Sequence, residues 1–235
     1  MATEASILRP ANEVHVWRVG LDSPSWPAAD LLPAPERARA ARLLPLDKRR
    51  RWVAARWALR VVLGRYLGQA PAEIAFRAGA HGKPALAGPA AGLRFNLSHS
   101  AGLALIAVSR GRDVGVDVEW VDRRRDVLAL APRALGPAEA ATVRRAPVAA
   151  RPLAFHAAWT RREAFAKCHG GGLAAPPPPG PLAVASIDAG AAYAAALAVE
   201  GSEAPPLRHL ALAPNEDGTG LLPASSRKHT PPAAA

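Results

Sequence analysis

Two carboxylates, Asp117 and Glu119, lie two residues apart in the segment Gly-Val-Asp-Val-Glu that begins at Gly115. Alternation of apolar and polar residues predicts a β-strand over Val114 to Val121, in which positions two apart share a face. The valines and Trp120 would then face the core. Two carboxylates on one face of a strand can ligate a hard cation such as Mg²⁺, which prefers oxygen ligands. The polar outer face of a sheet is the alternative reading.

A carboxylate and an ammonium group occur four residues apart in a predicted helix. The helix is expected from Arg151 to His169, and Gly170 to Gly172 would end it. Glu163 and Lys167 fall on one stripe of this helix. An i,i+4 pair of this kind is usually a weak surface salt bridge, although the same stripe could also face a site.

Hydroxyl and imidazole groups cluster in Phe-Asn-Leu-Ser-His-Ser, which ends at Ser100. Strands are predicted over Leu93–Leu97 and Leu103–Ser109, with the Ser-His-Ser portion as the turn between them. Such side chains at a strand end can hold phosphate oxygens, or they can simply stabilise the turn. Ser98 and His99 are not a hydrolase pair, because neighbours on a strand point to opposite faces.

Helices in the first third of the chain would position these segments. A short strand is predicted over His15–Val19, then a basic helix near Pro35–Leu44, then a longer helix over Lys48–Leu67 with Asp47 as its N-cap and Gly68 as its end. One face of the longer helix is apolar at helical spacing and comprises Trp52, Ala55, Leu59, Val62, Leu63 and Tyr66.

Arginines line the edge of that apolar face, at Arg49, Arg56 and Arg60. They could stand at the rim of a pocket or form a solvated flank. The turn-like segment His-Gly-Lys-Pro, which contains Lys83 and Pro84, carries no chemical signal alone.

Helices followed by strands, twice over, predict an α+β fold of two similar halves. We expect an N-terminal half over residues 1–110 and a C-terminal half over 111–200. The second half would close with an antiparallel pair, Leu182–Ile187 and Tyr193–Val199. Residues 201–235 are rich in proline and alanine and predict a poorly ordered tail.

Composition narrows the function classes. Thirty Lys and Arg against nineteen Asp and Glu give a formal net charge of +11, which attracts anionic partners. Cys168 is the one cysteine, so internal disulfides are excluded, and no apolar run approaches the roughly 20 residues of a membrane span. We expect a cytoplasmic protein. A basic nucleic-acid-binding protein is the rival class, but it leaves the paired carboxylates unexplained.

Taken in order, four motifs resemble those of the Sfp-type 4′-phosphopantetheinyl transferase family. They are His-Gly-Lys-Pro, Phe-Asn-Leu-Ser-His-Ser, Gly-Val-Asp-Val-Glu and Trp-Thr-Arg-Arg-Glu-Ala-Phe-Ala-Lys followed by Gly-Gly-Leu. The resemblance runs from about Pro35 to Val199. It implies a pseudo-dimeric α+β fold with the active site in the cleft between the two halves, so a monomer is expected. It also implies transfer of the phosphopantetheine arm of coenzyme A to a serine of an apo acyl or peptidyl carrier protein, with release of adenosine 3′,5′-bisphosphate.

The resemblance also implies roles for individual residues. The Mg²⁺ ligands, with Mn²⁺ also possible, would be Asp117, Glu119 and Glu163. Glu163 and Lys167 would be catalytic. Coenzyme A would contact Arg56, Lys83, Pro84, Ser98, His99 and Lys167.

Two positions depart from the family pattern: Arg162 replaces the usual lysine, and Gly171 replaces a residue that is often charged. A family member that only binds carrier proteins or coenzyme A is a further alternative, which the intact Asp117, Glu119 and Glu163 disfavour. The resemblance fits fatty-acid, polyketide and nonribosomal-peptide carriers alike, and it implies no nucleic-acid or membrane partner.

Overall fold

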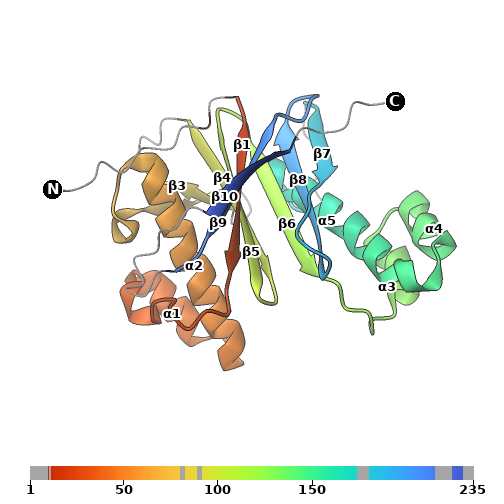
Figure 1. Cartoon of the computed structure of the whole chain (residues 1–235), viewed down its shortest axis with the longest axis horizontal. Coiled ribbons are helices and arrows are strands. Elements are labelled where there is room, and N and C mark those ends of the chain that lie inside the picture. The colour runs from red at the N-terminus through yellow and green to blue at the C-terminus, as the bar shows by residue number, and fades with distance from the viewer. Residues whose placement is uncertain are drawn as a thin grey trace.

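The fold is α+β, as predicted, with two sheets stacked face to face and a long helix on each outer face (Figure 1). The computed structural model describes residues 10, 12–79, 83–88, 92–173, 180–214 and 224–229, the last range by its backbone alone. His81 and Gly82 of the His-Gly-Lys-Pro segment lie outside the described residues. No helix in these ranges is both long and apolar enough to cross a bilayer.

The first sheet has five strands in the order β10-β9-β1-β5-β4. Strand β1 pairs antiparallel with β5 and parallel with β9. The strand bounds are β1 Val14–Gly20, β4 Leu93–Ser100, β5 Leu103–Arg110, β9 Leu207–Leu212 and β10 Ala224–His229. A separate two-stranded hairpin is formed by β2 Phe76–Ala78 and β3 Pro84–Leu86.

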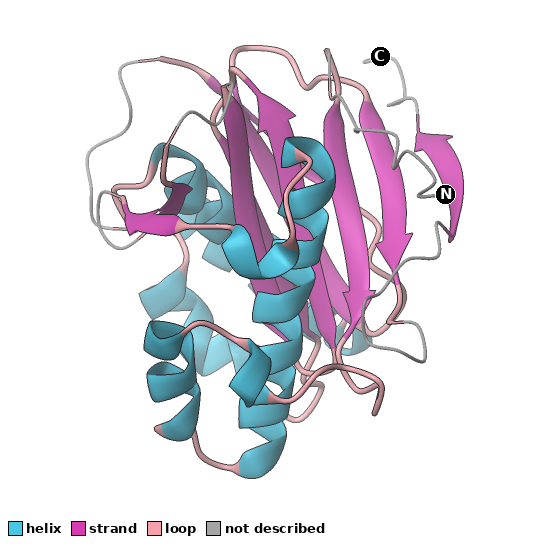
Figure 2. Ribbon diagram, turned by 90° about the vertical axis from the view of Figure 1, so that its left-hand side faces the viewer, coloured by secondary structure: helices cyan, strands magenta, loops and turns pink. Residues whose placement is uncertain are grey.

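Helix α2 (Leu46–Leu67) covers the outer face of this sheet, where Figure 2 shows helices lying across the strands. The predicted apolar face is buried except for Trp52, which is half-buried. The helix ends at Gly68, whose φ of 65° is the left-handed conformation that glycine adopts freely. Asp47 was predicted as the N-cap, which is wrong: the helix begins at Leu46, and Pro45 occupies the N-cap position. The short helix α1 (Ala34–Ala41) packs beside α2.

The second sheet has three antiparallel strands in the order β6-β8-β7. Their bounds are β6 Val114–Trp120, β7 Leu182–Ser186 and β8 Tyr193–Glu200, so the predicted closing pair is confirmed. Helix α5 (Arg151–His169) has its predicted bounds and packs on the outer face of this sheet. Two shorter helices, α3 (Val127–Ala134) and α4 (Pro137–Arg145), lie beside it.

The inner faces of the two sheets form one apolar layer. Val114, Val116 and Val118 of β6 are buried there against β1, β5 and β8. Burial of all three valines confirms the predicted alternation along β6. Trp120 departs from it: this side chain is 40% exposed, because it stands at the end of β6 beyond the layer.

The predicted poorly ordered tail is wrong for part of its length. Residues 207–212 form β9, which pairs with β1. Leu210 and Leu212 are buried in the core beneath α2. This strand was not predicted because it pairs with β1, almost 200 residues earlier in the chain, and local composition does not indicate so distant a pairing.

Two further local expectations need correction. Ser98, His99 and Ser100 belong to strand β4 rather than to a turn, and the chain reverses afterwards at Ala101, which has φ of 46°. Helix α3 was not predicted, although Asp126 is a typical N-cap residue: its side chain accepts hydrogen bonds from the amides of Leu128 and Ala129.

Candidate active site

Asp117 is the central acidic group of the site. Its side chain is 3% exposed. Oδ1 accepts hydrogen bonds from Lys167 Nζ at 2.6 Å and from the hydroxyl of Ser98 at 2.8 Å. Oδ2 is also buried, yet it has no hydrogen-bond partner among the described residues. A buried carboxylate oxygen without a partner is costly, so Asp117 is arranged to receive a further cation or donor.

Glu119 lies on the same face of β6 and is half-buried. The Ser100 hydroxyl donates to its Oε2 at 2.8 Å. Burial raises the pKa of Glu119 above its ordinary value, and the negative charge of Asp117 raises it further, whereas the Ser100 hydrogen bond opposes the shift. The predicted strand geometry therefore does bring two carboxylates together on one face.

Helix α5 contributes the third carboxylate and the ammonium group. Burial raises the pKa of Glu163, and the charges of Asp117 and Glu119 act in the same direction, while Lys167 opposes them. Lys167 forms its salt bridge across to β6 rather than along the helix to Glu163. The simple i,i+4 surface pair is therefore not what this helix forms.

Gly115 explains how α5 comes so close to β6. A Cβ atom at this position would overlap the carbonyl oxygen of Ala164 and the amide nitrogen of Cys168. These are backbone atoms of the helix, so no side-chain movement could relieve the overlap. The glycine at the start of Gly-Val-Asp-Val-Glu thus sets the distance between the carboxylates on β6 and the groups on α5.

Gly115→Ala is expected to lower the melting temperature by about 2–12 °C, because overpacking of a filled contact costs roughly 1–3 kcal/mol. It should also reduce activity, since α5 carries Glu163 and Lys167. Gly20→Ala is the matched control, because a Cβ there meets nothing within 4 Å. Thermal unfolding of both variants checks the expectation, and equal melting temperatures would contradict it.

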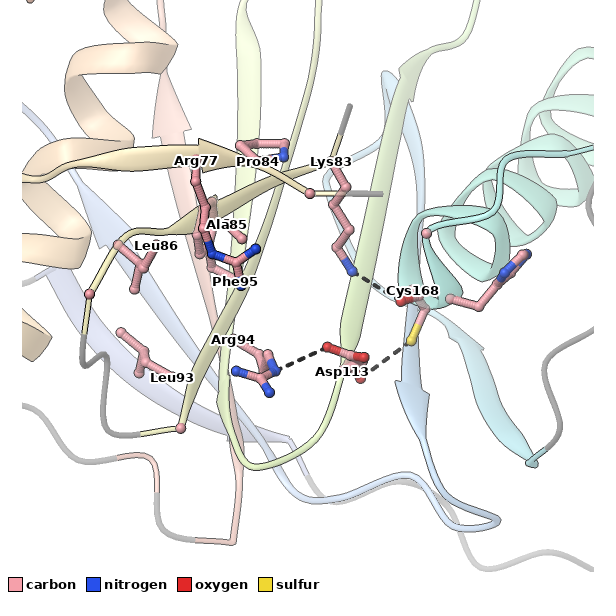
Figure 3. A pocket seen from close by; sticks show the side chains of 15 residues that line it. Arg77, Lys83, Pro84, Ala85, Leu86, Leu93, Arg94, Phe95, Asp113 and Cys168 are labelled. Atoms are coloured by element: carbon pink, nitrogen blue, oxygen red, sulfur yellow. Dashed lines mark hydrogen bonds and ion pairs between the residues drawn. The ribbon is translucent and has the colours of Figure 1, made fainter. Parts of the chain in front are cut away.

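Lys83 joins the β2–β3 hairpin to the second sheet. Its Nζ donates to the carbonyl oxygens of Cys168 at 3.0 Å and Val114 at 3.2 Å, and burial lowers its pKa. Figure 3 shows this side chain reaching across a pocket of about 380 Å³ towards the end of α5. Arg94 pairs with Asp113 on the same pocket wall. The Cys168 thiol is buried and its pKa is raised to about 12, so it is unreactive as a nucleophile.

A neighbouring pocket of about 460 Å³ brings four of the predicted site residues together. Lys83, Pro84, Glu163 and Lys167 line it, along with Asn96 and Leu97 of β4. These residues come from the hairpin, β4 and α5, so the pocket spans elements of both halves of the chain.

His99 and Arg56 do not line this pocket. His99 is exposed on the side of β4 opposite to Ser98; surrounding protein and the charge of Lys167 lower its pKa. The Nε of Arg56 donates to Glu36 of α1 at 3.0 Å, and its guanidinium lies 4.8 Å from the centre of the Phe76 ring.

The arginine stripe on α2 is therefore not a solvated flank. Arg60 is buried and binds both Glu36 and the carbonyl oxygens of Pro71 and Ile74. Glu36 accordingly links two arginines of α2, and this pairing holds its pKa below the ordinary value although burial opposes the shift.

Whether the site suits a divalent cation can be judged from its donor set. Among the residues that the structure describes, no three His, Cys, Asp or Glu side chains already converge at ligand distances. The buried, unpartnered Oδ2 of Asp117 nevertheless offers an oxygen to a cation. Carboxylate oxygens are the donors that Mg²⁺ prefers. The residues present fit such an ion.

Sequence reasoning missed Asn96 and Ser100 as functional candidates. Both send side chains from β4 to the backbone of β6. Their signal was present in the alternation Asn-x-Ser-x-Ser, which places three polar side chains on one face of β4. Glu36 was missed as well, and nothing local marked it as the partner of two arginines.

Comparison with known proteins gives the family. The model of the 4′-phosphopantetheinyl transferase superfamily matches residues 113–210. The chain is 41% identical over 169 residues to the 4′-phosphopantetheinyl transferase HetI of Nostoc sp.. These aligned residues cover 70% of this chain and 71% of HetI. The chain belongs to the 4′-phosphopantetheinyl transferase superfamily.

Two further relatives agree with this membership. The Synechocystis sp. protein slr0495, provisionally named for the same transferase activity, is 32% identical over 68% of this chain and 65% of its own length. The 4′-phosphopantetheinyl transferase AcpT of Salmonella typhimurium is 35% identical over 53% of this chain and 60% of AcpT. The superfamily match extends to residue 210 and so includes most of β9, which the sequence had assigned to a tail.

Proposed function

We propose that this superfamily member transfers the 4′-phosphopantetheine arm of coenzyme A to a serine of an apo acyl or peptidyl carrier protein. Adenosine 3′,5′-bisphosphate would be the second product. The observation that carries the proposal is the buried, unpartnered Oδ2 of Asp117, with Glu119 beside it and the Glu163–Lys167 stripe of α5 across from it. This arrangement suits a reaction at a polyphosphate.

Asp117, Glu119 and Glu163 would hold Mg²⁺, and the same oxygen donors also suit Mn²⁺. When bound, the ion would neutralise charge on the diphosphate of coenzyme A. Support comes from the electrostatics of the three carboxylates, because each of Glu119 and Glu163 has a pKa raised partly by neighbouring negative charge. A cation would relieve that repulsion.

Glu163 is our proposed general base. The acceptor hydroxyl must lose its proton as its oxygen attacks the β-phosphate, and the Glu163 carboxylate lines the pocket proposed for coenzyme A, within reach of that reaction. Lys167 would contact the diphosphate and stabilise the negative charge that develops as the bisphosphate leaves.

Coenzyme A would occupy the pocket between the two halves, which are proposed to form a pseudo-dimer. Lys83 and Pro84 border that pocket and would contact the adenine. His99 and Arg56 would meet phosphate groups. Ser98 would reach a phosphate only by giving up its hydrogen bond to Asp117.

The net charge of +11 favours carrier proteins with acidic surfaces, because opposite charges speed encounter. A cytoplasmic monomer completes the proposal. We propose no nucleic-acid partner, because nucleic-acid binding would leave the carboxylates of Asp117, Glu119 and Glu163 unexplained.

The direct test is to incubate the chain with coenzyme A, Mg²⁺ and a panel of apo carrier proteins, then weigh the products. We expect at least one carrier class to gain the mass of a phosphopantetheine arm, and no carrier to gain it when the metal is chelated. Binding of carriers without any mass gain would favour the alternative of a member that only binds them.

Arg56→Ala is expected to raise the KM for coenzyme A about ten- to a hundredfold, because a charge-assisted hydrogen bond to phosphate contributes roughly 1.5–3 kcal/mol. Steady-state kinetics with dephospho-coenzyme A, which lacks the 3′-phosphate, should show a much smaller effect. An unchanged KM together with a lower melting temperature would instead assign Arg56 to the Glu36 ion pair alone.

A further inference from the structure

Strands β4 and β6 are edge strands of separate sheets, and the side chains of β4 join them. Asn96 Oδ1 accepts from the Val116 amide at 2.9 Å, and the next two links repeat this pattern. Ser98 Oγ accepts from the Val118 amide at 3.3 Å, and Ser100 Oγ accepts from the Trp120 amide at 3.1 Å. We call this set of three links the seam. It satisfies amide groups that an unpaired edge would leave open.

The two serines of the seam also donate hydrogen bonds to carboxylates of β6, whereas Asn96 contacts only the backbone there. A serine hydroxyl has one hydrogen and two lone pairs. Ser98 gives its hydrogen to Asp117, and Ser100 gives its hydrogen to Glu119, both at 2.8 Å. The lone pairs of Ser98 are taken by the Val118 amide and by Lys167 Nζ at 3.1 Å. Each hydroxyl is thus fixed by the backbone of β6 and in turn fixes a carboxylate of β6.

We propose that Ser98 and Ser100 are positioning residues, which aim the Asp117 and Glu119 carboxylates and thereby set the affinity of the chain for a divalent cation. The inference rests on the metal site of the proposed function. Two neighbouring carboxylates repel each other and would rotate apart if free. Anchoring one oxygen of each leaves the other oxygen available to a cation, as the unpartnered Oδ2 of Asp117 already is.

Ser100 offers the cleaner test, because Ser98 also contacts Lys167. Ser100→Ala removes the hydrogen bond to Glu119, whereas Ser100→Thr keeps a hydroxyl. Asn96→Ala is the matched control: it breaks a link of the same seam without touching a carboxylate. The measurement is Mn²⁺ binding by electron paramagnetic resonance, on the protein without coenzyme A, together with the melting temperature of the metal-free protein.

The expected result is a Mn²⁺ affinity about tenfold or more weaker in Ser100→Ala, in the range that loss of a ligand's supporting hydrogen bond produces. Ser100→Thr should recover most of that loss. Asn96→Ala should lower the melting temperature but leave the affinity within about threefold of the wild type.

Three outcomes would overturn the inference, and the third, which also overturns the metal site, is distinguishable from the first two. If the wild type binds Mn²⁺ and Ser100→Ala binds it equally well, Ser100 only links β4 to β6 and does not position Glu119. The proposed metal site itself would then remain supported. Equal losses in Ser100→Ala and Asn96→Ala would lead to the same conclusion. If the wild type binds no Mn²⁺ at all, the metal site itself fails and the inference fails with it.

Discussion

Asp117→Ala is expected to leave a folded protein whose transferase activity is at least about a hundredfold lower. Loss of a group that stabilises transition-state charge typically costs on the order of 3 kcal/mol, and each 1.36 kcal/mol is a factor of about ten in rate. Folding should survive, because the freed Lys167 side chain is already 30% exposed and can reach solvent. The measurement is kcat/KM for carrier modification over a series of Mg²⁺ concentrations.

Asp117→Asn is the matched variant for this prediction. The amide oxygen can still accept the Ser98 hydrogen bond, but the negative charge is gone. We expect it to be nearly as inactive as Asp117→Ala while melting closer to the wild type. Near-normal activity of either variant at limiting Mg²⁺ would refute the metal assignment.

A chain that ends at Glu200 is expected to be largely unfolded. It lacks β9, so β1 loses its parallel partner and the core loses Leu210 and Leu212. Burial of each leucine contributes roughly 1.5–3 kcal/mol, and about 5–15 kcal/mol is the whole stability of a typical domain. Circular dichroism and thermal unfolding measure the loss.

The control is a chain that ends at Pro214, which keeps β9 and omits β10. Its melting temperature should stay far closer to that of the full chain, because both buried leucines remain. If the chains ending at Glu200 and Pro214 both melt near the temperature of the full chain, β9 contributes little to stability and this prediction is wrong.

The sequence by itself determined most of the local elements and the family. Alternation of valine with acidic residues was sufficient for β6, and helical spacing between Arg151 and Gly170 was sufficient for α5. These predictions succeeded because the periods of strands and helices can be read from residues that are close together in the sequence. The ordered motifs then indicated the family, which the relatives confirmed.

Only the tertiary structure decided which groups meet. The pairing of Lys167 with Asp117, of Glu36 with Arg56 and of β9 with β1 each joins residues far apart in the chain. Such contacts depend on how closely whole elements approach. That approach is set at single points, such as the missing side chain of Gly115 against the backbone of α5. Local periodicity reports which face a side chain occupies, but the identity of its partner depends on the packing of the complete fold.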